Sequence, residues 1–220
     1  MRNTHLLPGF WRGVNINQNA IFLECFIDEL AEAAGKDPLE FRRSIMSKNP
    51  KSLAVLNAVA EKAGWGKEHP KGHYLGLAHF RAFGSYIAAC AEISVQDGNK
   101  VKVHRIVGAT DCGYAVNPAQ VERQVAGSFV YGLSAALYGE ITVGGGAIEQ
   151  ANFDSYPMLK MADAPEMETH LALSGGKRWG GIGEPATPPI APAVCNAIFA
   201  ITGKRIRSLP ISDTELTGRT

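Results

Sequence analysis

The spacing of apolar residues changes near residue 66, and this change limits the folds open to the chain. Residues 19–63 carry apolar side chains at the spacing of a helix, about 3.6 residues per turn, whereas residues 74–110 form runs rich in Val, Ile, Ala and aromatics. The segment GWGKEHPKGHYLG between them is rich in glycine and charge, which is typical of a surface connection. We therefore predict an α+β fold, with a helical portion over 1–66 and, over 67–220, a mixed or antiparallel sheet packed with helices.

Three helices are expected in the first portion. The first ends at Gly35, where a C-terminal cap belongs, and the second, over 38–47, begins at the natural N-cap Asp37. The third covers 51–63. The first helix is expected to bury one face, formed by Phe22, Phe26, Ile27, Leu30 and Ala34.

The second portion alternates strands with long helices. Strands are predicted over 74–83, 86–96 and 100–110, with the turn signal QDGN joining the last two. Further strand-like pieces lie at 139–143 and 167–173. Helices are predicted over 118–138, which is unusually rich in small residues, and over 188–202, where Gly203 ends the helix. The last 15 or so residues are expected to form an arm.

Composition excludes several classes of protein. The chain has 220 residues, 45% of them apolar, and its net charge of +1 includes no basic stripe, so nucleic-acid binding is not expected. The uncharged run 185–203 contains four prolines and is better explained as a buried helix than as a membrane span. The first residues resemble no signal peptide, so we expect the chain to be cytoplasmic by itself, or periplasmic only if exported with a partner. The cysteines are too scattered for a zinc or iron–sulfur motif: Cys25, Cys90, Cys112 and Cys195.

The most informative segment for chemistry is RWGGIGEPATPPIAPAV. Glycines at Gly180, Gly181 and Gly183 precede Glu184, and a proline-rich helix start follows. Glycine lets backbone approach a ligand closely, and a helix N-terminus favours a carboxylate, so Glu184 is a candidate general base. The alternative is a tight turn followed by a surface charge.

Two other segments are candidates for ligand binding. In DCGYAVNPAQVERQVAGSFVYG, Gln124 lies inside the small-residue helix and could donate to and accept from a heterocycle edge, or could be an ordinary surface residue. In GFWRGVNINQN, Arg12 and the adjacent backbone N–H groups could bind an anion, or the segment could be a plain loop. His69 and His73 are separated by Pro70 and Gly72, so we predict no metal site. No GxSxG nucleophile motif is present.

Taken together and in order, these segments resemble the C-terminal part of the molybdenum-cofactor subunit of the xanthine oxidase family, the molybdenum hydroxylases. The likeness extends over nearly the whole chain, through WRGVN, FIDELAEAAGKDPLEFR, EISVQDGNKVKVHRIVGATDCGYAVNP, ANFDSYPML and GGIGEPATPPIAPAVCNAIFAITGKRIRSLP. It is greatest to the isoquinoline 1-oxidoreductase beta-subunit and aldehyde-oxidoreductase branches. The fold it implies is that of the second molybdenum-cofactor-binding domain.

The resemblance implies a reaction and assigns residues to it. Members of the family oxidise an N-heterocycle or an aldehyde by inserting water-derived oxygen, with hydride passing to a Mo=S centre. Glu184 matches the base that acts on the Mo–OH group, and Gln124 matches a glutamine that binds the pterin. Arg12 matches the position whose backbone approaches the metal, which makes the WRG loop cofactor-facing, and Gly181 and Gly183 belong to the glycine motif beside it. Val14 stands where some relatives carry a substrate-stacking phenylalanine.

The resemblance also implies partners. Relatives of this branch are several times longer, so the molybdenum–pterin cofactor is expected to be shared with a larger molybdopterin-binding chain or an N-terminal portion. Because the four cysteines form no cluster motif, electrons are expected to leave through an iron–sulfur or cytochrome subunit. The alternative is a non-catalytic remnant or assembly module that binds no cofactor by itself. A hydrolase that uses Glu184 would need a second carboxylate, which no motif supplies.

Overall fold

The described elements follow the predicted order closely. The computed structural model describes residues 9–97 and 99–216. The helices are α1 (Ile16–Ala33), α2 (Pro38–Ile45), α3 (Pro50–Ala63), α4 (Pro118–Tyr138) and α5 (Ile190–Thr202), with short 3₁₀ turns η1 (Met161–Asp163) and η2 (Ile211–Asp213). The strands are β1 (Tyr74–Ala82), β2 (Ser85–Gln96), β3 (Lys100–Asp111), β4 (Val143–Gly144), β5 (Ala147–Ile148) and β6 (Glu166–Leu171). No helix in these ranges is long and apolar enough to cross a bilayer.

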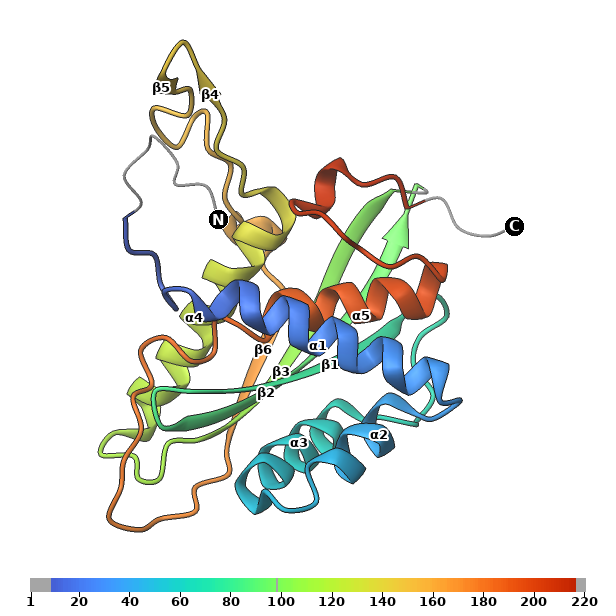
Figure 1. Cartoon of the computed structure of the whole chain (residues 1–220), viewed down its shortest axis with the longest axis vertical. Helices are drawn as coiled ribbons and strands as arrows, with labels where there is room; N and C mark the ends of the chain where they lie inside the picture. The colour runs from blue at the N-terminus through green and yellow to red at the C-terminus, as the bar shows by residue number, and fades with distance from the viewer. Residues whose placement is uncertain (1–8, 98, 217–220) are drawn as a thin grey trace.

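A four-stranded sheet in the order β1-β2-β3-β6 forms the centre of the molecule (Figure 1). β1, β2 and β3 are antiparallel neighbours, and β6 returns parallel to β3 after α4, so the sheet is mixed, as predicted. The QDGN signal does lie between β2 and β3, although its Gly98 is outside the described residues. The piece at 139–143 is not a strand before Val143, where the small β4–β5 hairpin begins.

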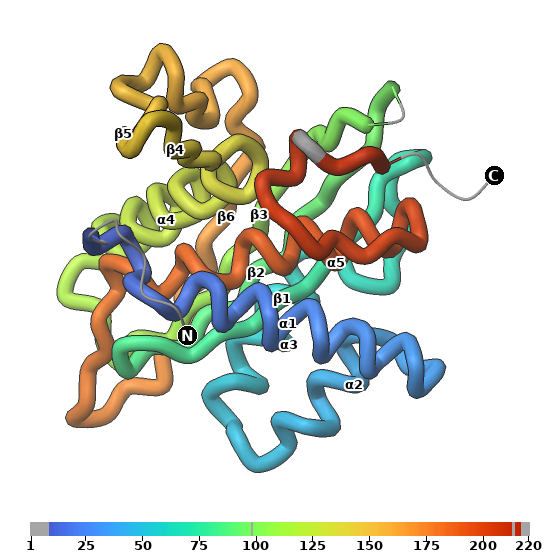
Figure 2. Tube along the Cα trace, turned by 45° about the horizontal axis from the view of Figure 1, so that its top comes forward, coloured from blue at the N-terminus to red at the C-terminus, as the bar shows by residue number. Residues whose placement is uncertain are grey.

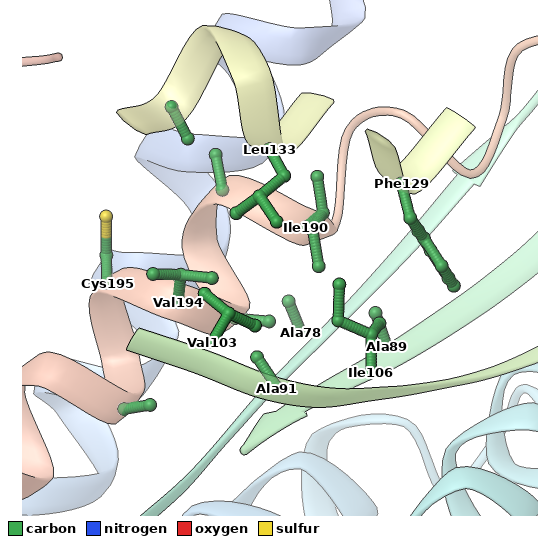
Figure 3. Close-up of a cluster of buried hydrophobic side chains, with 14 of the residues drawn as sticks. Ala78, Ala89, Ala91, Val103, Ile106, Phe129, Leu133, Ile190, Val194 and Cys195 are labelled. Atoms are coloured by element: carbon green, nitrogen blue, oxygen red, sulfur yellow. The ribbon is translucent and has the colours of Figure 1, made fainter. Parts of the chain in front are cut away.

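Both faces of the sheet are covered, which explains why its strands are apolar almost throughout. Leu77, Ala88 and Val107 point to the face packed by α2 and α3. On the opposite face, Ala89, Ala91 and Ile106 lie under Phe129 and Leu133 of α4 and under Ile190 of α5 (Figure 3). The C-terminal arm packs on the body, since Ile206, Ile211 and Leu216 are buried in this core; residues 217–220 lie outside the described ranges.

The small residues of α4 serve close packing at one position. A Cβ on Gly132 would lie 2.4 Å from Ile190 Cγ2 and 2.8 Å from the Thr187 carbonyl oxygen. Glycine therefore allows α4 to approach the start of α5 directly. This contact fixes the segment before α5, which carries Glu184, relative to α4, which carries Gln124.

The predicted buried face of α1 is wrong. Phe22, Phe26 and Leu30 are exposed at 71%, 55% and 40%, and only Ile27 of that set is buried. The inward face of α1 instead consists of Ala20, Glu24, Cys25, Ile27, Asp28 and Ala31. Arg42 of α2 is fully buried and binds Glu24 and Asp28, so this ion network turns the acidic side of α1 inward.

Helix caps agree with the sequence. The Asp37 carboxylate accepts hydrogen bonds from the N–H groups of Leu39 and Glu40, and Gly35 adopts a left-handed conformation after α1. At the opposite end of α1, Figure 2 shows the segment just before the helix lying beside α4.

Candidate functional site

A tight turn before α1 forms the first part of the site. The Val14 N–H donates to the Trp11 carbonyl at 2.7 Å, and Gly13 and Val14 both have positive φ, +92° and +50°. A Cβ on Gly13 would lie 2.5 Å from Asn17 Oδ1. A β-branched valine at positive φ is costly, and such conformations persist where surrounding contacts impose them.

Arg12 joins this turn to two distant segments. Its Nε donates to the Gly183 carbonyl at 2.7 Å, and its Nη2 donates to the Gln124 backbone and side-chain oxygens at 3.1 and 2.9 Å. The guanidinium also lies 5.9 Å from the centre of the Tyr131 ring. Partial burial lowers the pKa of Arg12, while Tyr131 and Glu184 act in the opposite direction. One guanidinium thus holds together the turn, α4 and the glycine-rich segment.

Glu184 lies beside the same turn and is half-buried. Its Oε1 accepts the Gly13 N–H at 3.1 Å, and its backbone carbonyl accepts the Thr187 N–H at 3.0 Å. Its other oxygen, Oε2, accepts no hydrogen bond from residues 9–97 or 99–216. The carboxylate is therefore oriented by one donor and keeps one oxygen available to a ligand or a water.

The structure brings Arg12, Gln124, Gly183 and Glu184 together, but Gly181 lies further along. The Gly181 N–H donates to the Phe83 carbonyl at 2.8 Å, and its own carbonyl accepts the Ser85 hydroxyl at 2.6 Å. Gly181 thus anchors the glycine-rich segment to the β1–β2 turn. Its assignment to a cofactor stays a prediction.

Two further residues contact the turn before α1 but were not singled out from the sequence. Asn17 donates from Nδ2 to the Arg12 carbonyl at 2.8 Å, and Tyr131 packs its ring 4.8 Å from that of Trp11. Tyr131 follows Gln124 by seven residues, so both lie on one face of α4. That seven-residue spacing could have indicated Tyr131, whereas nothing in the local pattern around Asn17 points to its contact with the turn.

The site is an open face of this chain rather than a closed pocket. Gln124 and Gly183 are exposed, and a Cβ on Gly183 would meet nothing within 4 Å. A cavity of about 460 Å³ lies near the other end of α1, lined by Trp65, Tyr74 and Phe199 among others, and includes none of the four convergent residues. A ligand bound at the open face would therefore need a second polypeptide surface to enclose it.

The histidines and cysteines lie elsewhere. His73 Nδ1 is 2.7 Å from the Glu92 carboxylate, and His79 is buried in β1. Within the described ranges, no three His, Cys, Asp or Glu side chains are arranged to hold a metal ion. All four cysteines are free thiols and buried.

Comparisons with known proteins give a consistent result. Residues 17–165 match the sequence model of the molybdopterin cofactor-binding domain, which includes Gln124 but not Arg12, Gly183 or Glu184. The beta subunit of isoquinoline 1-oxidoreductase from Brevundimonas diminuta is 31% identical over 206 residues, which make up 92% of this chain and 26% of that protein. A nicotinate dehydrogenase subunit of Pseudomonas putida is 32% identical over 228 residues, 95% of this chain and 19% of that protein.

A solved structure shares the fold. The aldehyde oxidoreductase of Desulfovibrio gigas superposes with a TM-score of 0.70 and 15% identity, over 91% of this chain and 40% of that one. The chain spans about a quarter or less of the length of the two curated relatives.

Proposed function

This chain belongs to the molybdopterin cofactor-binding domain family, of the xanthine oxidase type, and we propose that it supplies one wall of the cofactor and substrate site of a molybdenum hydroxylase. The complete enzyme would oxidise an N-heterocycle or an aldehyde, as the names of the relatives suggest. The observation that carries the proposal is the convergence of Arg12, Gln124, Gly183 and Glu184 from three separate segments.

The donor set fits a molybdenum–pterin cofactor. The exposed Gln124 amide can donate to and accept from a heterocycle edge, and the bare Gly183 backbone leaves room for a flat group to approach. When bound, that cofactor supplies oxygen insertion from water and accepts the hydride equivalent. The chain itself supplies orientation and a proton acceptor.

In this proposal Glu184 takes a proton at Oε2. The Gly13 N–H holds Oε1, so the turn restrains the orientation of the carboxylate, and Oε2 is left for the reacting water-derived group. Arg12 fixes the Gly183 carbonyl next to it and keeps Gln124 close to the turn. Correct placement of a base before reaction is itself a large part of its effect.

Partners follow from length and from the open face. The chain spans 26% and 19% of the length of the two curated relatives. We therefore propose that a larger molybdopterin-binding polypeptide or a longer N-terminal portion supplies the rest of the cofactor site. An iron–sulfur or cytochrome subunit would then take the electrons, since the buried thiols of this chain form no cluster motif.

One observation favours an alternative function. The Gln124 side-chain oxygen already accepts a hydrogen bond from Arg12, so half of its capacity is used within the chain. A non-catalytic remnant or assembly module would keep such a contact for stability alone. The alternative predicts that the chain carries no molybdenum in any complex.

The test of the base is Glu184→Gln in the assembled enzyme. The amide keeps the acceptor for the Gly13 N–H but cannot take a proton, so we expect kcat to fall by about 10²–10⁴-fold with unchanged molybdenum content. Glu122→Gln is the matched control, because Glu122 is an exposed carboxylate on α4. Near-normal turnover of Glu184→Gln would overturn the assignment.

A further inference from the structure

We propose that Asn17 is a positioning residue, which holds the turn of residues 11–14 so that the Gly13 N–H points at Glu184. This inference rests on the proposed function, in which Glu184 is the base. It concerns an amide side chain on the first turn of α1 whose only hydrogen bond to the described residues goes to the turn.

The contacts of Asn17 explain the shape of the turn. Its Nδ2 donates to the Arg12 carbonyl at 2.8 Å, so the peptide between Arg12 and Gly13 is held from the carbonyl side. Because a peptide unit is planar, fixing that carbonyl also fixes the direction of the Gly13 N–H. The same N–H is the one that donates to Glu184 Oε1 at 3.1 Å.

Close packing adds a second constraint. The Asn17 amide lies so near Gly13 that a Cβ there would be 2.5 Å from Oδ1 and 2.7 Å from Nδ2. Asn17 Oδ1 is also buried without a hydrogen-bond partner in the described part of the chain. An unpaired buried acceptor has a free-energy cost, and its presence indicates that the side chain is placed for the bond made by Nδ2.

The strain in the turn requires such a restraint. Gly13 and Val14 both have positive φ, and valine adopts this conformation only when neighbouring contacts impose it. Arg12 restrains the turn through its side chain, whereas Asn17 restrains it through the backbone. Without Asn17, the Gly13 N–H would be free to rotate away while Arg12 kept its bonds to α4 and Gly183.

The experiment uses Asn17→Asp and Asn17→Ala in the assembled enzyme. Aspartate keeps the size of the side chain but cannot donate to the Arg12 carbonyl when ionised, so it separates the lost bond from lost volume. Asn19→Ala is the matched control, since Asn19 is exposed on the same helix. Thermal unfolding of each variant checks that the complex is folded.

The first readout is amide hydrogen exchange, which needs no turnover. We expect faster exchange for a peptide covering residues 12–14 in both Asn17 variants, and wild-type exchange in Asn19→Ala. Glu184→Gln should keep this peptide protected, because its amide oxygen still accepts the Gly13 N–H. Unchanged exchange at residues 12–14 in Asn17→Asp would overturn the positioning role.

The second readout is the split between kcat and KM. Since Asn17 acts through Glu184, kcat should fall about tenfold with KM unchanged, and the loss should vanish in the Glu184→Gln background. A tenfold loss that persists in that background would contradict the inference. Full activity of Glu184→Gln with altered exchange in Asn17→Asp would instead refute the base and leave the positioning geometry standing.

Discussion

Two regions of the molecule hold a carboxylate near an arginine, but the arginine bonds the carboxylate in only one of them. Glu24 and Arg42 lie in the buried network between α1 and α2, whereas Glu184 and Arg12 lie at the open face near the start of α1. Glu24 is 1% exposed, and its Oε2 accepts from both Arg42 Nε at 3.1 Å and the His79 N–H at 3.0 Å. Glu184 is half-buried, and its carboxylate accepts one N–H within the described ranges.

The comparison separates a structural ion pair from a group available for chemistry. Burial raises the pKa of Glu24 although Arg42 opposes the shift, so this carboxylate is costly to keep in place and gives no ligand access. Arg42 also donates to Asp28 Oδ1 and to the Pro38 carbonyl, so the buried guanidinium is bonded to groups of the protein itself. Arg12 instead binds carbonyl and amide oxygens, and no cation among residues 9–97 and 99–216 is bonded to Glu184. In our proposal, the Oε2 atom left without a donor is the one that takes the proton.

The largest effect on stability is expected from opening the buried network. Arg42→Ala would leave Glu24 and Asp28 buried next to each other without that cation, and we expect a loss of about 3–5 kcal/mol in the free energy of unfolding. Urea unfolding of the purified chain measures it. Arg43→Ala removes a partly exposed arginine paired with Glu40 and should cost about 1 kcal/mol or less. Equal losses in the two variants would show that the buried network stabilises the fold no more than a surface ion pair does.

The buried network should also impose a pH dependence. Burial lowers the pKa of His79 to about 4, so between about pH 6.5 and 4 the unfolded chain binds a proton that the folded chain does not. This contribution to stability is complete above that window and is lost as the pH falls through it, by up to about 3 kcal/mol.

His79→Phe isolates the contribution of His79 to this pH dependence, because phenylalanine keeps an aromatic ring at the position but cannot take up a proton. The difference in unfolding free energy between variant and wild type should shift in favour of the variant as the pH falls from 7 to 4. Carboxylates such as Glu24 titrate in both proteins and cancel in this difference. A difference that stays constant with pH would show that His79 takes up a proton as readily in the folded chain as in the unfolded chain, which contradicts this prediction.

The smallest changes in the free energy of unfolding are expected from substitutions of two glycines near Arg12. Gly13→Ala would place a Cβ 2.5 Å from Asn17 Oδ1 at a φ of +92°, and we expect a loss of about 1–3 kcal/mol. On α4, a Cβ at Gly127 would meet Arg12 Nη1 at an ordinary 3.6 Å, so Gly127→Ala should be neutral or stabilise by up to about 1 kcal/mol. Thermal unfolding compares them. Destabilisation by Gly127→Ala as large as that by Gly13→Ala would place the tight contact on α4 instead of in the turn.

Local signals made most of the fold predictable from the sequence. The Asp37 cap, Gly35 and Gly203 mark helix ends, and runs rich in Val, Ile and Ala on either side of QDGN indicate the antiparallel strands, because these signals act over a few residues. The face of α1 was not predictable in this way. A hydrophobic pattern assigns phenylalanines to the inside, whereas Arg42 from α2 and Arg205 from after α5 draw Glu24 and Asp28 inward.

The site was predictable only in part and for a different reason. Arg12, Gln124 and Glu184 are 112 and 60 residues apart along the chain, so their convergence followed from family resemblance and not from spacing. The contact of Asn17 depends on a backbone direction that no local pattern encodes, whereas the seven-residue spacing from Gln124 could have indicated Tyr131. Gly181 belongs to the same short motif as Gly183 but contacts the β1–β2 turn instead.

The central claim, that this chain forms one wall of a molybdenum–pterin site, has a direct test. The tagged chain is purified from its native host, and the companion polypeptides and the molybdenum per chain are measured together. We predict a larger companion polypeptide, or a longer form of the chain itself, with close to one molybdenum per chain. A 220-residue chain isolated without a companion and without molybdenum would contradict the claim and favour the non-catalytic module.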